Sequence, residues 1–235
     1  MTPIPKIYTI VNEELERKSL ESKLQPKIIE LPKQNIDGYV QLPSGIYIAE
    51  ERSLGNLDWD NSHKNLLNEK LRMAKPREQW DLIFHCKDNS ENLRYKNIYD
   101  EYLETGGWRA EWSNAIFVKG TGFKGLDIAY VIGRDKSGDF IHQTEPLEEC
   151  VWEDCYVDIS SPKNINRQGM PTRRADNQKS HEKGKNIYHW FPRENSVGRL
   201  DVNSSRANFN CNGNRWNSNP SLRIAHLFLG FGIFY

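Results

Sequence analysis

Three successive stretches in the first half of the chain repeat apolar side chains three and four positions apart, which is the spacing of one helix face. Asn61 or Ser62 can cap the first helix, and Pro76 suits the first turn of the second. The third helix begins at about Glu91 and stops at the Gly106-Gly107 pair. The apolar positions that define the three helices are Leu66, Leu67, Leu71, Trp80, Ile83, Phe84, Ile98, Tyr99, Tyr102 and Leu103.

Strand-like runs flank these helices on both sides. The run before them has a Pro-Ser-Gly turn at its centre, and the runs after them are rich in aromatic and β-branched side chains. One pair of runs can form a hairpin across a turn at residues 135–138. The predicted strands cover residues 39–49, 108–119, 126–133, 139–143 and 150–159. Between Ser160 and Lys185 the chain is polar and rich in turn residues, so we expect a long excursion over the surface.

The last part of the chain first alternates and then becomes apolar. Phe209 and Cys211 fall on one side of an extended segment, and the three Asn residues that flank them fall on the other. Residues 222–235 are dense in aromatic and aliphatic side chains, which favours a buried final strand. The order of elements predicts an α+β domain over residues 38–235, preceded by a lead-in over residues 1–37.

Composition excludes several classes of partner. Lys and Arg together number 32, as do Asp and Glu, so the net charge is zero and nothing points to nucleic acid. No apolar run approaches the roughly 18 to 20 residues of a membrane helix, and the first residues lack the apolar stretch of a secretory signal. We therefore expect no nucleic-acid partner, no membrane insertion and no export by the usual route.

Residues able to do catalytic chemistry are scattered. The four cysteines are too few and too dispersed for a disulfide framework, and Cys150 and Cys155 with His142 fit no zinc spacing. The histidines show neither a Ser-His-Asp nor a Glu-x-x-His arrangement. The residues concerned are Cys86, Cys150, Cys155, Cys211, His142, His181, His189 and His226. The sequence therefore predicts packed thiols and imidazoles, with no catalytic residue, metal or cofactor.

The C-terminal part has an unusual composition. Asn recurs at positions 203, 208, 210, 212, 214, 217 and 219, and from residue 195 onward there is no Lys, Glu, Gln or Met. An Asn codon in which both adenines are randomised and the final pyrimidine is kept cannot become Lys, Glu, Gln, Met, Trp or a stop. Trp216 is the exception to this rule. An Asn-rich loop of biased composition is the alternative explanation.

The segment from Asn195 to Arg223 resembles the variable region of target proteins that are diversified by diversity-generating retroelements. In those systems an error-prone reverse transcriptase copies a template, randomises its adenines and overwrites the end of the target gene. The resemblance extends upstream, because residues 75–80, 98–101 and 107–117 look like the helix-then-strand body of the same proteins. Such proteins belong to phages or prokaryotes.

The resemblance implies a C-type lectin fold of the formylglycine-generating-enzyme-like type. In that fold, two to three short helices pack on a mixed, mainly antiparallel sheet with paired terminal strands, a long loop region and a buried C-terminal strand. The variable region would cover residues about 199–225. The family motif continues Leu-Gly-Val-Arg after the variable run, whereas this chain reads Leu222-Arg223-Ile224-Ala225, which leaves the end of the diversified segment open.

The function that the resemblance implies is ligand binding by a diversified surface. The ligand would be a protein or a cell-surface molecule. The lack of a signal peptide and of a transmembrane segment predicts a cytoplasmic or virion-associated location. Arg206, Arg215 and Trp216 would supply the larger contacts. The expected ligand-binding residues are Asp201, Asn203, Ser204, Ser205, Asn208, Asn210, Asn212, Asn214, Trp216, Asn217, Asn219 and Ser221.

Two alternatives fit the residues less well. An enzyme of the formylglycine-generating type needs two cysteines a few residues apart near the C-terminus to hold copper, and Cys211 stands alone there. A calcium-dependent lectin needs a Glu-Pro-Asn or Gln-Pro-Asp triplet and a Trp-Asn-Asp triplet, which supply hard oxygen ligands. Glu145-Pro146-Leu147 and Trp216-Asn217-Ser218 each miss one of the required residues. We therefore expect a binding protein rather than an enzyme.

Overall fold

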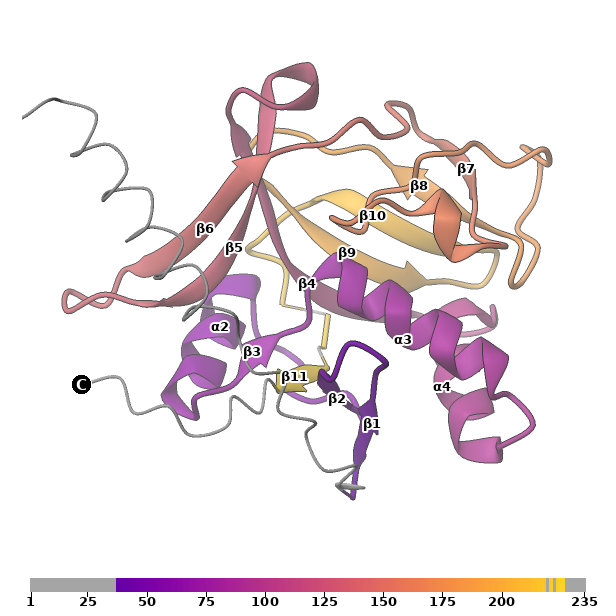
Figure 1. The fold of residues 1–235 in the computed structure, drawn as a ribbon, viewed down its shortest axis with the longest axis horizontal. Coiled ribbons are helices and arrows are strands. Elements are labelled where there is room, and N and C mark those ends of the chain that lie inside the picture. Colours follow the sequence, from indigo (N-terminus) through magenta and orange to yellow (C-terminus); the bar gives the residue numbers. More distant parts are fainter. Residues whose placement is uncertain (1–36, 219, 222, 227–235) are drawn as a thin grey trace, which may run out of the picture. The chain divides into compact units, whose positions relative to one another are not determined.

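The computed structural model describes residues 37–218, 220–221 and 223–226. They all belong to one unit that begins at Asn35. The predicted lead-in, apart from its last residue, and residues 227–235 of the predicted final strand lie outside the described part. Three described helices pack with a mixed, mostly antiparallel sheet, so the α+β class is confirmed (Figure 1).

The larger sheet has seven described strands in the order β6-β5-β4-β9-β10-β8-β7. Their bounds are β4 (Arg109–Lys119), β5 (Leu126–Arg134), β6 (Phe140–Pro146), β7 (Cys155–Asp158), β8 (Asn186–Trp190), β9 (Ser196–Val202) and β10 (Ala207–Gly213). Among these strand pairs only β10 and β8 run parallel. The predicted hairpin is confirmed as β5 and β6, whereas the predicted strand 150–159 is reduced to β7.

A smaller sheet brings the C-terminal segment back among the early elements. Its order is β1-β2-β11-β3. The strands are β1 (Tyr39–Gln41), β2 (Tyr47–Ala49), β3 (Arg72–Met73) and β11 (Ile224–His226). The β1–β2 hairpin accounts for the predicted run around the Pro-Ser-Gly turn, and β11 pairs antiparallel with both β2 and β3. Strand β11 is therefore held by strands that lie more than a hundred residues earlier in the sequence.

The helices are α2 (Trp59–Asn68), α3 (Pro76–Asp88) and α4 (Leu93–Leu103). The predicted start of α3 at Pro76 is confirmed. The predicted caps of α2, Asn61 and Ser62, are wrong, because the helix begins earlier. The Asp58 carboxylate accepts a hydrogen bond from the Asn61 N–H at 2.7 Å, which satisfies a donor of the first turn.

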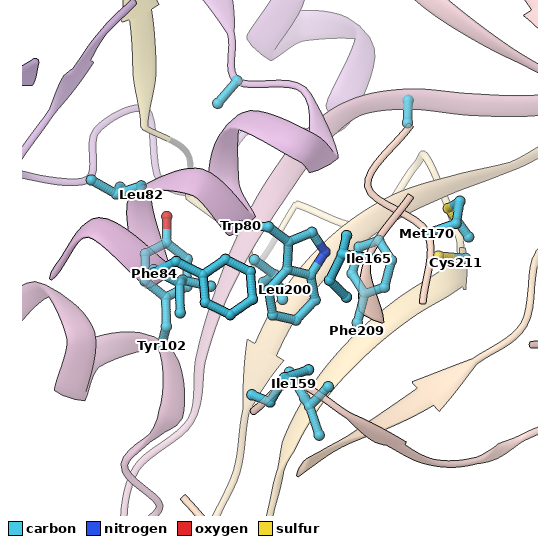
Figure 2. Close-up of a cluster of buried hydrophobic side chains, with 14 of the residues drawn as sticks. Trp80, Leu82, Phe84, Tyr102, Ile159, Ile165, Met170, Leu200, Phe209 and Cys211 are labelled. Carbon is cyan, nitrogen blue, oxygen red and sulfur yellow. The ribbon is translucent and has the colours of Figure 1, made fainter. Parts of the chain in front are cut away.

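Each face of the larger sheet has its own apolar cluster. On one face, Trp80 of α3 stacks on Phe84 at 6.2 Å between ring centroids and meets Phe209 of β10 edge-on at 5.6 Å (Figure 2). On the other face, Trp59 of α2 packs in a cluster with Trp112 of β4. The two clusters fix the sheet between α3 and α4 on one side and α2 on the other.

The long connection between β7 and β8 is not only a surface excursion. Ile165 and Met170 are buried in the same cluster as Trp80, so the prediction for residues 160–185 is wrong in this part (Figure 2). The Trp80 indole N–H donates to the Gly169 carbonyl at 2.9 Å. Gly169 has φ +85°, and a Cβ there would lie 2.4 Å from the Arg77 nitrogen, so this close approach requires glycine.

The Asn114 side chain bonds to the backbone of β5 at the position where β4 is irregular. The register of β4 against β9 shifts between Trp112 and Ile116, and Asn114 lies within that bulge. Its amide oxygen accepts from the Val131 N–H at 2.8 Å, and its amide nitrogen donates to the Val131 carbonyl at 2.9 Å. The buried Asn114 therefore satisfies the backbone of β5 where β4 cannot.

A buried ionic cluster connects the C-terminal segment to β4. The Arg223 guanidinium is 1% exposed and contacts Glu111 and Glu101, each at 2.6 Å. Glu111 also accepts from the Tyr102 hydroxyl at 2.6 Å and from the Gln79 amide at 3.0 Å. Burial by itself lowers the pKa of Arg223. The combined effect of Tyr102 and the two glutamates raises the pKa by more than burial lowers it, so the net shift is upward. The arginine is charged at every accessible pH.

Two histidines are packed inside the protein. His63 of α2 meets the Trp59 ring edge-on at 4.2 Å and the Phe140 ring at 5.8 Å. His189 of β8 stacks on Phe209 at 5.8 Å, and its Nε2 lies 3.2 Å from the Val151 carbonyl. Burial is the main cause that lowers the pKa of His63 to about 3 and that of His189 to about 4. Both are therefore neutral in the folded protein near pH 7.

We expect the substitution Arg223→Met to lower the free energy of unfolding by about 3–5 kcal/mol, because it leaves the buried Glu111 carboxylate without its cation. Urea denaturation followed by circular dichroism measures this loss. The double variant Arg223→Met/Glu111→Gln should lose less than the single variant, since the uncompensated charge is gone. An unchanged urea midpoint in Arg223→Met would contradict the role given to the ion pair.

We expect the stability to fall as the pH is lowered from the ordinary histidine pKa of 6.5 towards 4. In that window the unfolded chain binds protons on His63 and His189 while the folded protein does not, so each contributes a slope of up to about 1.4 kcal/mol per pH unit. Urea midpoints at several pH values test this. His63→Phe should remove about half of the slope, and a flat profile in the wild type would refute the assignment.

Candidate functional site

Strand β10 separates its side chains onto two faces of the sheet. Ala207, Phe209 and Cys211 are fully buried on the face that packs against α3. Asn208 and Asn210 point to the opposite face, since successive strand residues alternate. The predicted extended segment is confirmed, and Asn is tolerated there because neighbouring strands pair with both edges of β10.

The cross-strand neighbours of the two Asn residues are polar or aromatic. Asn208 lies opposite Asp201 of β9 and Tyr188 of β8, and side chains directly opposite each other share a face. Asn210 lies opposite Arg199 and Trp190 in the same way. We call this surface, together with Arg206, the β10 face. It consists of Tyr188, Trp190, Arg199, Asp201, Arg206, Asn208 and Asn210.

The floor of the β10 face is a hydrogen-bonded network. Asp201 accepts from the Asn208 amide at 2.7 Å and pairs with the Arg199 guanidinium at 2.9 Å. Burial raises the pKa of Asp201, and Arg199 and the two Asn side chains offset part of that rise. Asp201, Asn208 and Asn210 are each 8% exposed or less. Three of the predicted binding residues therefore form the floor of the face, with small side chains.

Arg206 lies across the aromatic part of the face. Its guanidinium carbon is 4.0 Å from the Tyr188 ring centroid and 5.6 Å from that of Trp190. These two rings meet edge-on at 5.2 Å, and Tyr156 of β7 continues the row at 5.1 Å from Tyr188. Tyr188 and Trp190 are the strand neighbours of Asn208 and Asn210, so Arg206 stacks on the part of the face that adjoins the two Asn residues.

The turn between β9 and β10 contains three of the predicted binding residues. The Asn203 amide oxygen accepts from the Ser205 N–H at 2.9 Å and from the Arg206 N–H at 3.0 Å. Asn203 therefore shapes the turn and orients Arg206. Ser204 and Ser205 are exposed at the tip. The Ser205 hydroxyl also donates to the Asn203 amide oxygen at 2.9 Å, so Asn203 and Ser205 form the turn and Ser204 lies exposed beside them.

The loop after β10 lies at the other end of the strand. Asn214 is exposed, and its amide oxygen accepts from the Trp216 N–H at 3.0 Å. Asn217 of the loop is half-buried, as is Asn212 near the end of β10. Trp216 is 66% exposed. Arg215 pairs with Asp60 of α2, and its guanidinium lies 5.6 Å from the Trp59 ring and 5.1 Å from the Trp216 ring. The base of the loop is thus anchored, and Trp216 projects from it.

Ser221, another predicted binding residue, does not join this surface. Ser221 bonds to β4: its N–H donates to the Ala110 carbonyl at 3.0 Å, and its carbonyl accepts from the Trp112 N–H at 2.9 Å. It pairs with the edge of β4 that faces away from β9, so it supports the sheet rather than the β10 face. Asn219 lies outside the described residues.

No family model, curated protein or solved structure matches the chain. Within the described ranges, no group of three or more His, Cys, Asp and Glu side chains could hold a metal ion. None of the helices in that part of the chain has the length and apolar character needed to cross a membrane.

Sequence reasoning missed the aromatic half of the face. Strand β8 was not predicted, because it follows a long polar stretch and is only five residues long. The available signal was the run from Ile187 to Trp190, in which aromatic side chains at positions 188 and 190 share one face of a strand. Arg199 was also missed as a partner of Asp201, since that contact depends on the strand conformation.

We expect Asn203→Ala to lower the free energy of unfolding by about 1–2 kcal/mol, because the Ser205 and Arg206 N–H groups lose their acceptor. Thermal unfolding followed by circular dichroism gives the measurement. Ser204→Ala is the matched control at the exposed tip, and its effect should stay within about 0.5 kcal/mol. Equal effects of the two substitutions would contradict a structural role for Asn203.

Proposed function

We propose that the chain is a ligand-binding display protein, and that adenine-directed mutagenic retrohoming diversifies residues on its β10 face and in the adjoining loops. One observation carries the proposal. Asp201, Asn208 and Asn210, which are codon-compatible with such diversification, share the sheet face that is opposite the main core. Residues on that face can change without disturbing the side chains that pack against α3.

The genetic code supports the same division. Asn codons carry adenine at both of their first two positions. Core-facing residues of β9 and β10, such as Leu200, Phe209 and Cys211, have codons with no adenine at those positions. Adenine-directed mutation would therefore change Asp201, Asn208 and Asn210 and leave the packed face intact.

A C-type lectin fold belongs to the same proposal. Its support is the order of helices before sheet, the long connection between β7 and β8, and the return of the C-terminal segment to the N-terminal strands through β11 and β2. In this arrangement, β9 and β10 lie in the middle of the sheet and hold the diversified residues on a rigid base.

Binding would combine a few large anchors with small polar contacts. Trp216 and Arg206 are the large side chains next to the diversified positions, and Trp and Arg are the usual energetic anchors of protein interfaces. Ser204, Ser205 and Asn214 are exposed and can make adaptable hydrogen bonds. A larger residue at Asn208 or at Asn210 would project from the floor and alter the shape of the face.

The buried position of Cys211 favours binding over the enzymatic alternative. Cys211 is fully buried, and burial raises the pKa of its thiol well above its ordinary value. Burial also raises the pKa of Cys150, to about 12. A reactive or metal-binding cysteine needs an accessible thiolate, which these environments disfavour.

We expect related copies of the gene to differ mainly at codons 201–217 on the β10 face and its loops, and to agree at the core-facing codons of β9 and β10. Sequencing several copies together with their flanking DNA tests this. The flanking DNA should hold a reverse-transcriptase gene and an imperfect repeat of codons 195 to about 225, with adenines at the variable positions. Differences spread evenly along the gene, or a locus without the repeat, would refute the proposal.

A further inference from the structure

We propose that the β10 face of this variant binds a carboxylate of an acidic segment on a partner protein, through the Arg206 guanidinium. The inference rests on the proposed function in one respect only, since it takes the β10 face as the ligand surface. It adds the chemical class of the ligand and the residue that recognises it.

Arg206 is held in place without using its hydrogen-bond donors. Stacking over the Tyr188 and Trp190 rings restricts the planar guanidinium, and the Asn203 amide fixes the backbone at its base. Among the described residues, no side chain or carbonyl accepts a hydrogen bond from that guanidinium. A guanidinium fork matches a carboxylate in geometry and can bind it through two parallel hydrogen bonds. Because the stacking already restricts the Arg206 side chain, binding of an anion costs little further side-chain entropy.

The charges around Arg206 favour an anionic ligand. Asp201 is the acidic residue of the β10 face, and its carboxylate already pairs with Arg199 and accepts from Asn208. Arg215 at the far end of β10 is likewise paired, with Asp60. Within the described part of this surface, the uncompensated charge is the positive charge of Arg206. A cationic ligand would be repelled there.

A single free guanidinium also argues against a polyanion. Nucleic acids are bound by several cations along a phosphate backbone, and the net charge of this chain is zero. One arginine stacked over a Tyr and a Trp is instead typical of the anchor residues of protein–protein interfaces. An acidic side chain with a neighbouring aromatic residue would satisfy the Arg206 donors and pack on the Trp190 ring.

The test uses the full chain, labelled with ¹⁵N, and three peptides that differ only in charge: acetyl-Glu-Tyr-Glu-Tyr-Glu-amide and its Gln and Lys counterparts. Cross-peaks of the Arg206 Nε–H and the Trp190 indole N–H report binding at the face. We expect the Glu peptide to bind about tenfold more tightly than the Gln peptide at low salt. The Lys peptide should not bind, and added salt should lower the affinity of the Glu peptide.

Variants identify the residue that is responsible. Arg206→Gln should abolish the preference for the Glu peptide, and Arg206→Lys should keep only part of it, because an ammonium lacks the planar fork. Arg134→Gln, at an exposed arginine of the β5–β6 hairpin, is the matched control and should change nothing. Unshifted cross-peaks elsewhere in the spectrum show that each variant is folded.

Several results would overturn the inference. These are equal affinities for the Glu and Gln peptides, an undiminished preference in Arg206→Gln, or no binding of the Glu peptide at about 1 mM. If N-acetylneuraminic acid binds and the Glu peptide does not, the carboxylate belongs to a glycan, and a protein partner is rejected. The gene-copy comparison does not depend on Arg206, so a negative peptide test would not refute diversification. A negative gene-copy comparison would likewise not refute carboxylate binding by Arg206.

Discussion

The buried ion pair between Glu111 and Arg223 is the contact on which the rest of the sheet depends. Two charges inside a protein are tolerable only when their remaining donors and acceptors are also satisfied, and here Tyr102, Gln79 and Glu101 provide those partners. The pair forces the chain that leaves β10 to return to β4, where it adds Ser221 to the strand edge and then forms β11. The loop that carries Trp216 is therefore fixed at both ends, at β10 and at β4.

This arrangement lets a poor strand sequence occupy the middle of a sheet. The Asn residues of β10 contribute little strand propensity of their own. Phe209 and Cys211 hold the strand through the core, and β9 and β8 pair with its two edges. The strand is thus held through its core-facing side chains and its two neighbouring strands, and not by the propensity of its Asn residues. The same support explains why the bulge between Asn210 and Gly213 is tolerated next to the loop.

The elements that could be predicted from sequence are those fixed by local signals. Pro76 marks the start of α3, and the turn at residues 135–138 joins β5 to β6. The features that were not predicted depend on contacts between residues far apart in the sequence. Residues 165 and 170 are buried because they pack in the same cluster as Trp80 of α3, and β8 forms because it pairs with β10. For the site, alternation placed Asn208 and Asn210 on one face. Composition alone could not separate Asn203 and Ser221, which support the scaffold, from the residues of the β10 face.

The floor of the β10 face also limits how freely its positions can vary. Asp201 is buried and depends on both Arg199 and Asn208, so replacing Asn208 by an apolar residue removes one of the bonds that keep the carboxylate satisfied. Positions 201 and 208 are therefore coupled, and a tolerated change at one will favour particular residues at the other. Exposed positions such as Ser204 and Asn214 carry no such coupling through side-chain contacts across the strands. A diversified surface of this kind would vary independently at its rim and in linked pairs at its floor, where a change alters the shape of the face most.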